Sequence, residues 1–202
     1  MDHFEVFGLP RKMGIDTAAL QRTFYELQKR YHPDFQGQRT PEEQAQALDA
    51  SARLNAAYRS LRDPIARVEY LVRLEEGRET KEGATVKPKA PPELLAEMLE
   101  IQEALAEAKA GGLDDGTRAT LAEQRQRLMA RQRDEEARVT GPLSAEWDAA
   151  DPGARPGVLA KCKIALATRA YLRTVIDDLA QALGEGELGE GGEGQHVAHH
   201  RH

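Results

Sequence analysis

Apolar residues recur at helical spacing in successive segments of this chain, and this periodicity limits its fold more than any other feature. In the first long segment they stand at i, i+4, i+7 and i+11, on one face of a helix: Leu20, Phe24, Leu27 and Tyr31. Helix-start signals precede three such segments: Asp16, Thr40-Pro41 with Glu43, and Asp63-Pro64. The chain is therefore predicted to be all-α.

The first 75 residues are predicted to form one small helical domain. A short apolar segment from Phe4 to Leu9 precedes a helix over roughly residues 17–30. A second long helix begins at Pro41 and ends near Arg62, and a short one follows from Pro64. The inward stripe of the second long helix is expected to be Ala47, Leu48, Ser51, Leu54, Asn55, Tyr58 and Leu61. Two antiparallel long helices flanked by two short ones form a compact domain.

Residues 76–92 show no hydrophobic period and are predicted to be a linker, stiffened by its prolines. Residues 93–183 are predicted to be a three-helix bundle. Its first helix carries the core stripe Leu94, Met98, Ile101, Leu105 and Ala108 and breaks at Gly111-Gly112. Its second runs from Thr117 to Arg138 and is expected to end at Gly141-Pro142. Ser144 is then expected to cap a short segment that carries Trp147.

The last helix of the bundle has a long apolar stripe: Val158, Cys162, Ala165, Leu172, Ile176, Leu179 and Leu183. Ile164, Tyr171 and Val175 are expected to lie off this stripe. Residues 184–202 are rich in Gly, Glu and His and are expected to be a disordered, solvated tail. The spacing of its histidines matches no structural metal site, and no cofactor is expected.

Composition excludes several classes of protein. The 202 residues carry 34 acidic and 28 basic side chains, a net charge of −6, so no bulk attraction to nucleic acid is expected. Cys162 is the only cysteine, which fits a reducing compartment and a small core residue. No apolar run is long enough to span a membrane, and no signal peptide is recognised, so the protein is expected in the cytoplasm.

A rigid turn ends the first long helix. Pro33 disfavours helical geometry at His32, so the helix stops beside an imidazole and the carboxylate of Asp34. The exposed face of the same helix carries Arg22, Tyr25, Lys29 and Arg30. An acid–base pair is conceivable, but neither a nucleophilic motif nor a phosphate loop accompanies it. An alternative is that the cations of this helix contact the phosphates of a nucleic acid, although the cationic stripe is short and the second domain is acidic. A docking surface for a protein partner is favoured.

A second candidate surface lies on the first bundle helix. Leu95 and Leu99 fall outside its core stripe and stand beside three acidic residues, Glu100, Glu103 and Glu107. Two interpretations remain open: a binding surface for a partner, or a contact with a third helix of the same bundle.

The order of capped helices around Tyr31-His32-Pro33-Asp34 resembles a J-domain, the co-chaperone module that stimulates ATP hydrolysis by DnaK-type chaperones. The finer resemblance is to the HscB family of iron–sulfur cluster co-chaperones. It rests on MDHFEVFGLP (residues 1–10), LNAAYRSL (54–61), RVEYL (67–71), LLAEMLE (94–100) and EWDAA (146–150). The N-terminal cysteine pairs of the zinc-bearing variant of that family are missing.

The resemblance implies a non-enzymatic co-chaperone with two partners. Its J-domain would dock on an HscA-type ATPase chaperone through Arg22, Tyr25, Lys29, Arg30, His32, Pro33 and Asp34. Its bundle would bind the scaffold protein IscU through Leu95, Ala96, Leu99, Glu100, Glu103, Glu107 and Tyr171. Ala96 is smaller than the residue the family can carry, and Pro152 and Pro156 precede Tyr171 in an enlarged segment. The alternative is a general J-domain co-chaperone with another client.

Overall fold

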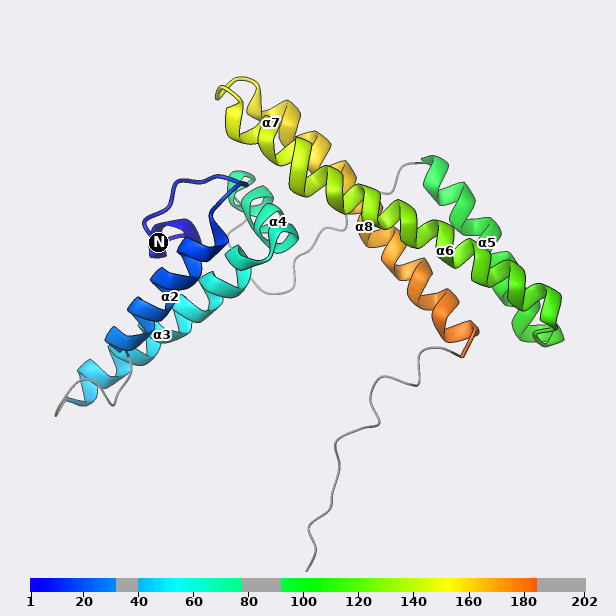
Figure 1. Ribbon diagram of the computed structural model, residues 1–202, viewed down its shortest axis with the longest axis horizontal. Helices are drawn as coiled ribbons and strands as arrows, with labels where there is room; N and C mark the ends of the chain where they lie inside the picture. Colours follow the sequence, from blue (N-terminus) through cyan, green and yellow to red (C-terminus); the bar gives the residue numbers. More distant parts are fainter. Residues whose placement is uncertain (32–39, 78–91, 185–202) are drawn as a thin grey trace, which may run out of the picture. The chain divides into compact units, whose positions relative to one another are not determined.

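The computed structural model describes residues 1–31, 40–77 and 92–184, and every regular element in those ranges is helical. Figure 1 shows these helices in the order of the chain, from α2 near the N-terminus to α8. The all-α fold class predicted from the periodicity is confirmed.

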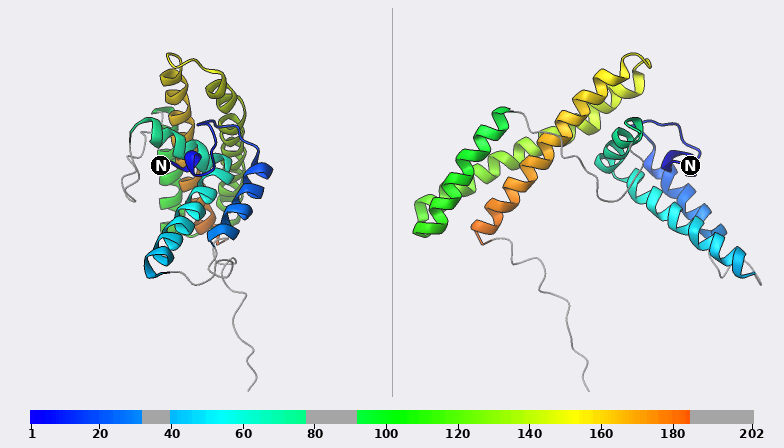
Figure 2. Two further views of the ribbon diagram at one scale, coloured as in Figure 1. Left: turned by 90° about the vertical axis from the view of Figure 1, so that its left-hand side faces the viewer. Right: turned by 180° about the vertical axis from the view of Figure 1, so that it is seen from behind.

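The N-terminal helices are α1 (His3–Val6), α2 (Thr17–Tyr31), α3 (Pro41–Arg62) and α4 (Pro64–Glu75). The two long helices α2 and α3 lie side by side, as Figures 1 and 2 show. The rings of Phe24 and Tyr58 stack between them with their centroids 4.0 Å apart. This aromatic pair sets the register of the hairpin.

The predicted helix starts are confirmed by their hydrogen bonds. The amide of Ala19 donates to the Asp16 carboxylate over 2.9 Å, and the amide of Ala66 donates to Asp63 over 2.7 Å. Thr40 and Glu43 form a reciprocal capping box at the start of α3. These bonds satisfy amides that have no partner within the helix, which explains why short sequence signals locate the helices well.

The C-terminal elements are α5 (Pro92–Gly111), α6 (Asp115–Arg138), η2 (Val139–Leu143), α7 (Ser144–Ala149) and α8 (Arg155–Ala182). The core stripe of α5 is confirmed, with Met98 only partly buried. Gly112 has a φ of 85°, a left-handed conformation that favours glycine and separates α5 from α6.

The chain divides into two compact units, each with its own core. Unit 1 combines Met1–Pro88 with Glu135–Ala167, and unit 2 combines Lys89–Asp134 with Thr168–His202. The core of unit 1 joins side chains of α1–α4 to Val139, Trp147 and Cys162. Residues of η2, α7 and the first half of α8 therefore complete the N-terminal core. The domain borders at residues 75 and 93 stay a prediction.

Leu48 is not part of the inward stripe of α3, so that prediction was wrong. Its side chain is 70% exposed, whereas Leu54 and Leu61 are buried. The stacking of Phe24 on Tyr58 places the last residue of α2, Tyr31, near the level of Ser51. Leu48 therefore lies beyond the described part of α2, where that helix offers no surface to cover it.

Three predictions for the C-terminal helices were also wrong. Gly141-Pro142 does not end the helical path, because Pro142, which has no amide proton, lies inside the π-helical turn η2. Ser144 makes no cap, and its hydroxyl donates to the carbonyl of Val139 over 2.6 Å. Val175 is buried rather than off the stripe. A helix that packs against two neighbours buries a wider arc than one stripe, and α8 meets both α5 and α6 in the core of unit 2.

Candidate partner-binding surfaces

The first candidate surface is the outer face of α2. Arg22, Tyr25, Lys29 and Arg30 are all exposed, while Leu20 and Phe24 on the other side of the helix are buried. Tyr25 is 52% exposed, and its ring contacts Phe24 at a centroid distance of 5.6 Å. The helix thus presents three cations and one aromatic ring to solvent, an arrangement suited to an acidic protein surface.

The other predicted members of this surface, His32, Pro33 and Asp34, lie outside the described residues, as does the side chain of Tyr31. The last residue of α2 is Tyr31. The cationic face therefore leads in sequence directly to the His-Pro-Asp segment.

The second candidate surface is on α5. Leu95 is 47% exposed and Leu99 is 61% exposed, unlike the buried Leu94 and Leu105. The remaining predicted residues of this helix are exposed as well: Ala96, Glu100, Glu103 and Glu107. The interpretation that the two leucines pack on a third helix of the bundle is therefore wrong, because α6 and α8 meet the opposite stripe of α5.

Tyr171 on α8 is half-buried against the core of unit 2. Helices α5 and α8 run in the same direction (Figure 1). The Gln102 side chain on α5 donates a hydrogen bond to the Asp178 carboxylate on α8 over 2.9 Å, and these two residues are 76 positions apart in the sequence. Leu95 and Tyr171 are also 76 residues apart, the separation that Gln102 and Asp178 have. Because the two helices are parallel, the alignment that pairs Gln102 with Asp178 also places Tyr171 level with Leu95 along the bundle axis.

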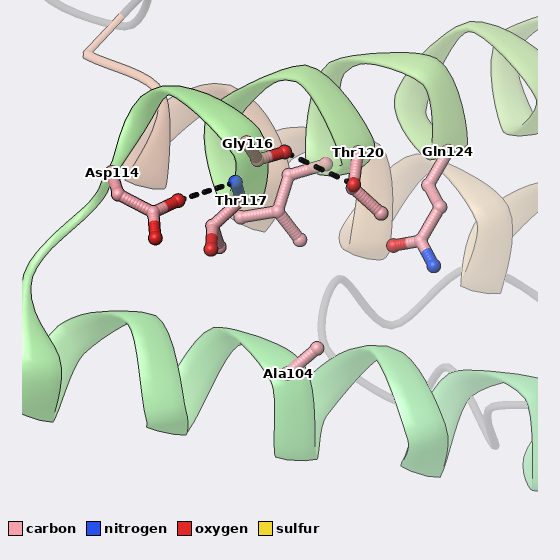
Figure 3. A pocket seen from close by; sticks show the side chains of 7 residues that line it. Ala104, Asp114, Gly116, Thr117, Thr120 and Gln124 are labelled. Atoms are coloured by element: carbon pink, nitrogen blue, oxygen red, sulfur yellow. Dashed lines mark hydrogen bonds between the residues drawn. The ribbon is translucent and has the colours of Figure 1, made fainter.

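The edge of α5 that faces α6 has different chemistry. There Glu97 forms an ion pair with Arg131 over 2.6 Å. An open cleft of about 400 Å³ lies farther along, lined by Ala104, Asp114, Gly116, Thr117, Thr120, Leu121 and Gln124 (Figure 3).

The polar groups of this cleft serve the start of α6. The Asp114 carboxylate accepts the amide of Thr117 over 2.6 Å, and this bond lowers the pKa of Asp114. The Thr120 hydroxyl donates to the carbonyl of Gly116 over 3.0 Å. The cleft contains none of the residues predicted to bind a partner, and its lining holds no nucleophile paired with a base.

Cys162 is buried, as the sequence predicted, and burial raises the pKa of its thiol to about 11. Such a thiol stays protonated near neutral pH and is a poor nucleophile. Within the described ranges, no group of three or more His, Cys, Asp or Glu side chains is arranged to hold a metal ion. The described helices include none that is long and apolar enough to cross a membrane.

Comparisons with known proteins match both parts of the chain. The DnaJ domain model matches residues 2–70, and the model of the HSCB C-terminal oligomerisation domain matches residues 90–155. The structure of chaperone HscB from Vibrio cholerae is 28% identical, with a TM-score of 0.53, over 89% of this chain and 99% of that one. The human co-chaperone protein HscB is 25% identical, with a TM-score of 0.60, over 90% and 81% respectively.

The α2–α3 hairpin, its flanking helices and the DnaJ domain match together define a J-domain protein. The C-terminal match and the likeness to two HscB structures narrow the class further. The chain belongs to the HscB-type co-chaperones, the family that its sequence resembles.

Several structurally important side chains were not recognised from the sequence. Asp148 accepts the amides of Met13 and Gly14, over 2.8 and 2.7 Å. Arg67, buried to 5% exposure, donates to the carbonyls of Met13 and Leu61. Asp148 lies in the EWDAA segment, one of the segments on which the family resemblance rests. No local sequence pattern indicates which backbone amides its carboxylate binds.

Proposed function

We propose that this co-chaperone binds the iron–sulfur scaffold IscU through the surface on α5 and Tyr171 and delivers it to an HscA-type, DnaK-like chaperone in the cytoplasm. The His32-Pro33-Asp34 turn and the α2 face stimulate the ATPase of that chaperone. The protein itself catalyses no reaction. The observation that carries the proposal is the exposure of Leu95 and Leu99 beside three glutamates on a helix whose other face is buried.

The mechanism assigns separate tasks to the two surfaces. The cations of α2 raise the rate of encounter with an acidic chaperone surface and orient the complex, an effect that salt screens. The leucines supply apolar area that is removed from water when the scaffold binds, and the glutamates select a partner with basic residues around its apolar contact.

The chaperone half of the proposal is tested by ATPase stimulation. The variant His32→Gln is expected to abolish stimulation of an HscA-type chaperone, measured with and without IscU, while IscU binding is unchanged. The matched control is Lys12→Gln, an exposed polar change outside the α2 face. Stimulation equal to the wild type in His32→Gln would refute this half of the proposal.

The scaffold half is tested by calorimetric titration of the full chain with IscU. Leu95→Ala and Leu99→Ala are each expected to weaken binding by roughly 1–3 kcal/mol, because each removes apolar area from the contact. Leu48→Ala is the control, since Leu48 is equally large and 70% exposed but lies on α3. If IscU does not bind the wild type while ATPase stimulation persists, the alternative of a general J-domain co-chaperone with another client is favoured.

A further inference from the structure

Helices α5 and α8 carry the two parts of the proposed scaffold surface, yet no short loop joins them. The two helices pack against each other through buried apolar side chains such as Leu105, Val175 and Leu179. Apolar packing is non-directional, so a shift of one helix along the other can preserve much of the buried area. A directional contact is needed to favour one register over its neighbours.

We propose that Gln102 and Asp178 are positioning residues that set this register and thereby hold Leu95 and Leu99 level with Tyr171. The inference rests on the proposed function, because it concerns the same surface. Neither residue is assigned a contact with the partner; both act through the placement of the leucines and the tyrosine.

The spacing of the four residues supports this role. Gln102 lies seven residues after Leu95, and Asp178 lies seven residues after Tyr171, as the sequence shows. Seven residues are about two helical turns, so each polar residue lies on the same side of its helix as the apolar residue before it. The 2.9 Å hydrogen bond therefore fixes the height of the contact residues two turns away. A slip by one turn would separate Leu95 from Tyr171 by about 5.4 Å along the axis.

The expected effect is moderate. Loss of one hydrogen bond changes an equilibrium between registers by about two- to ten-fold. Only molecules in the correct register bind the scaffold. The apparent dissociation constant therefore rises by the same factor by which the population of that register falls. Gln102→Ala and Asp178→Ala are therefore each expected to weaken IscU binding about two- to ten-fold, and the double variant by no more than either single one. Asp178→Asn keeps an acceptor oxygen and is expected to restore nearly full affinity.

The Glu97–Arg131 ion pair provides a matched control on the other edge of α5. Both side chains are less than half exposed, at 44% and 43%, and their 2.6 Å contact links α5 to α6 rather than to α8. Glu97→Ala removes a polar link of the same helix without touching the register between α5 and α8. It is expected to leave IscU affinity within about two-fold of the wild type.

The experiment combines calorimetric titration of these full-chain variants with IscU and a measurement that needs no partner. Spin labels at Ala106→Cys and Ala170→Cys, in a Cys162→Ala background, report the axial offset of α5 and α8 because both positions are exposed and distant along the axes. A narrow distance distribution is expected for the otherwise unchanged chain and for Asp178→Asn, and a broader or shifted one for Gln102→Ala.

Unchanged distributions and affinities in Gln102→Ala and Asp178→Ala would overturn the positioning role. Multiplicative losses of affinity in the double variant would overturn it too, because they indicate two independent contacts with the partner. If the wild type does not bind IscU, the proposed function fails, whereas the spin-label distances still decide whether this pair sets the register.

Discussion

At the scale of single residues, the contact of Asp148 with the chain near Met13 shows how a surface carboxylate becomes structural. Its two oxygens accept the amides of Met13 and Gly14, at positions 135 and 134 residues distant in sequence. Arg67 holds the carbonyl of Met13 over 2.6 Å. The segment before α2 is thus fixed through its backbone, in addition to the buried side chain of Met13.

Gly14→Ala tests this contact. A Cβ atom at Gly14 would lie 2.9 Å from the Asp148 carboxylate, so the carboxylate must move and its two hydrogen bonds weaken. We expect a loss of about 1–3 kcal/mol in the free energy of unfolding, measured by chemical denaturation. Gly153→Ala is the control, because no atom lies within 4 Å of its added Cβ. Equal stability of the two variants would contradict the role of the contact.

His3 makes the stability of α1 sensitive to pH. Its ring stacks on Tyr70 with a centroid distance of 4.1 Å, and its Nδ1 atom is buried without a partner. Burial lowers the pKa of His3 below 6.5; the charge of Asp2 opposes this shift and that of Arg73 adds to it. Since the unfolded state then binds the proton more readily, stability is full above about pH 6.5 and falls as the pH drops below it.

His3→Phe keeps an aromatic ring on Tyr70 and removes the titrating group. We expect the thermal midpoint to fall less between about pH 7.5 and about pH 5.5 in this variant than in the wild type. Differential scanning calorimetry at both pH values measures the difference. The same decrease in both proteins would show that His3 does not titrate on unfolding.

At the scale of elements, α2 combines a buried stripe and a cationic face within 15 residues. Tests of the cationic face need not disturb the fold, because Arg22 and Lys29 are exposed. Their contribution to the proposed chaperone contact is electrostatic, so it depends on ionic strength in a way that apolar contacts do not.

Arg22→Ala and Lys29→Ala are expected to weaken ATPase stimulation several-fold at low salt and to differ little from the wild type near about 1 M salt. The half-maximal co-chaperone concentration, measured at several salt concentrations, reports the effect. Lys12→Ala serves as the exposed cation outside the face. If the loss of ATPase stimulation does not depend on the salt concentration, these residues contribute through something other than their charge.

At the scale of the whole molecule, the chain builds two cores from segments that are not contiguous. Trp147 is buried to 1% exposure in the core of unit 1, and the guanidinium of Arg155 lies 5.2 Å from its ring centroid. Lys163 on α8 forms an ion pair with Glu76 just after α4. The stability of α1–α4 therefore depends on residues more than seventy positions farther along the chain.

Trp147→Ala is expected to cost about 3–5 kcal/mol and to accelerate hydrogen exchange of amides in α1 and α4, which share its core. Leu179→Ala, a fully buried change in the core of unit 2, is the control and should accelerate exchange mainly in α5 and in α8. Native-state exchange with mass spectrometry compares the two variants. Unaltered exchange of α1 and α4 in Trp147→Ala would show that the N-terminal helices form their core alone.

The sequence by itself determined the all-α class, the helix starts at Asp16, Thr40 and Asp63, and the separation of Leu95 and Leu99 from the core stripe of α5. These features depend on caps and spacings within a few residues, which the chain encodes locally. Only the tertiary structure decided that Leu48 is exposed, that Val175 is buried, and that Asp148 and Asp178 reach their partners. Each of these depends on which distant segment lies opposite, and no local pattern specifies that.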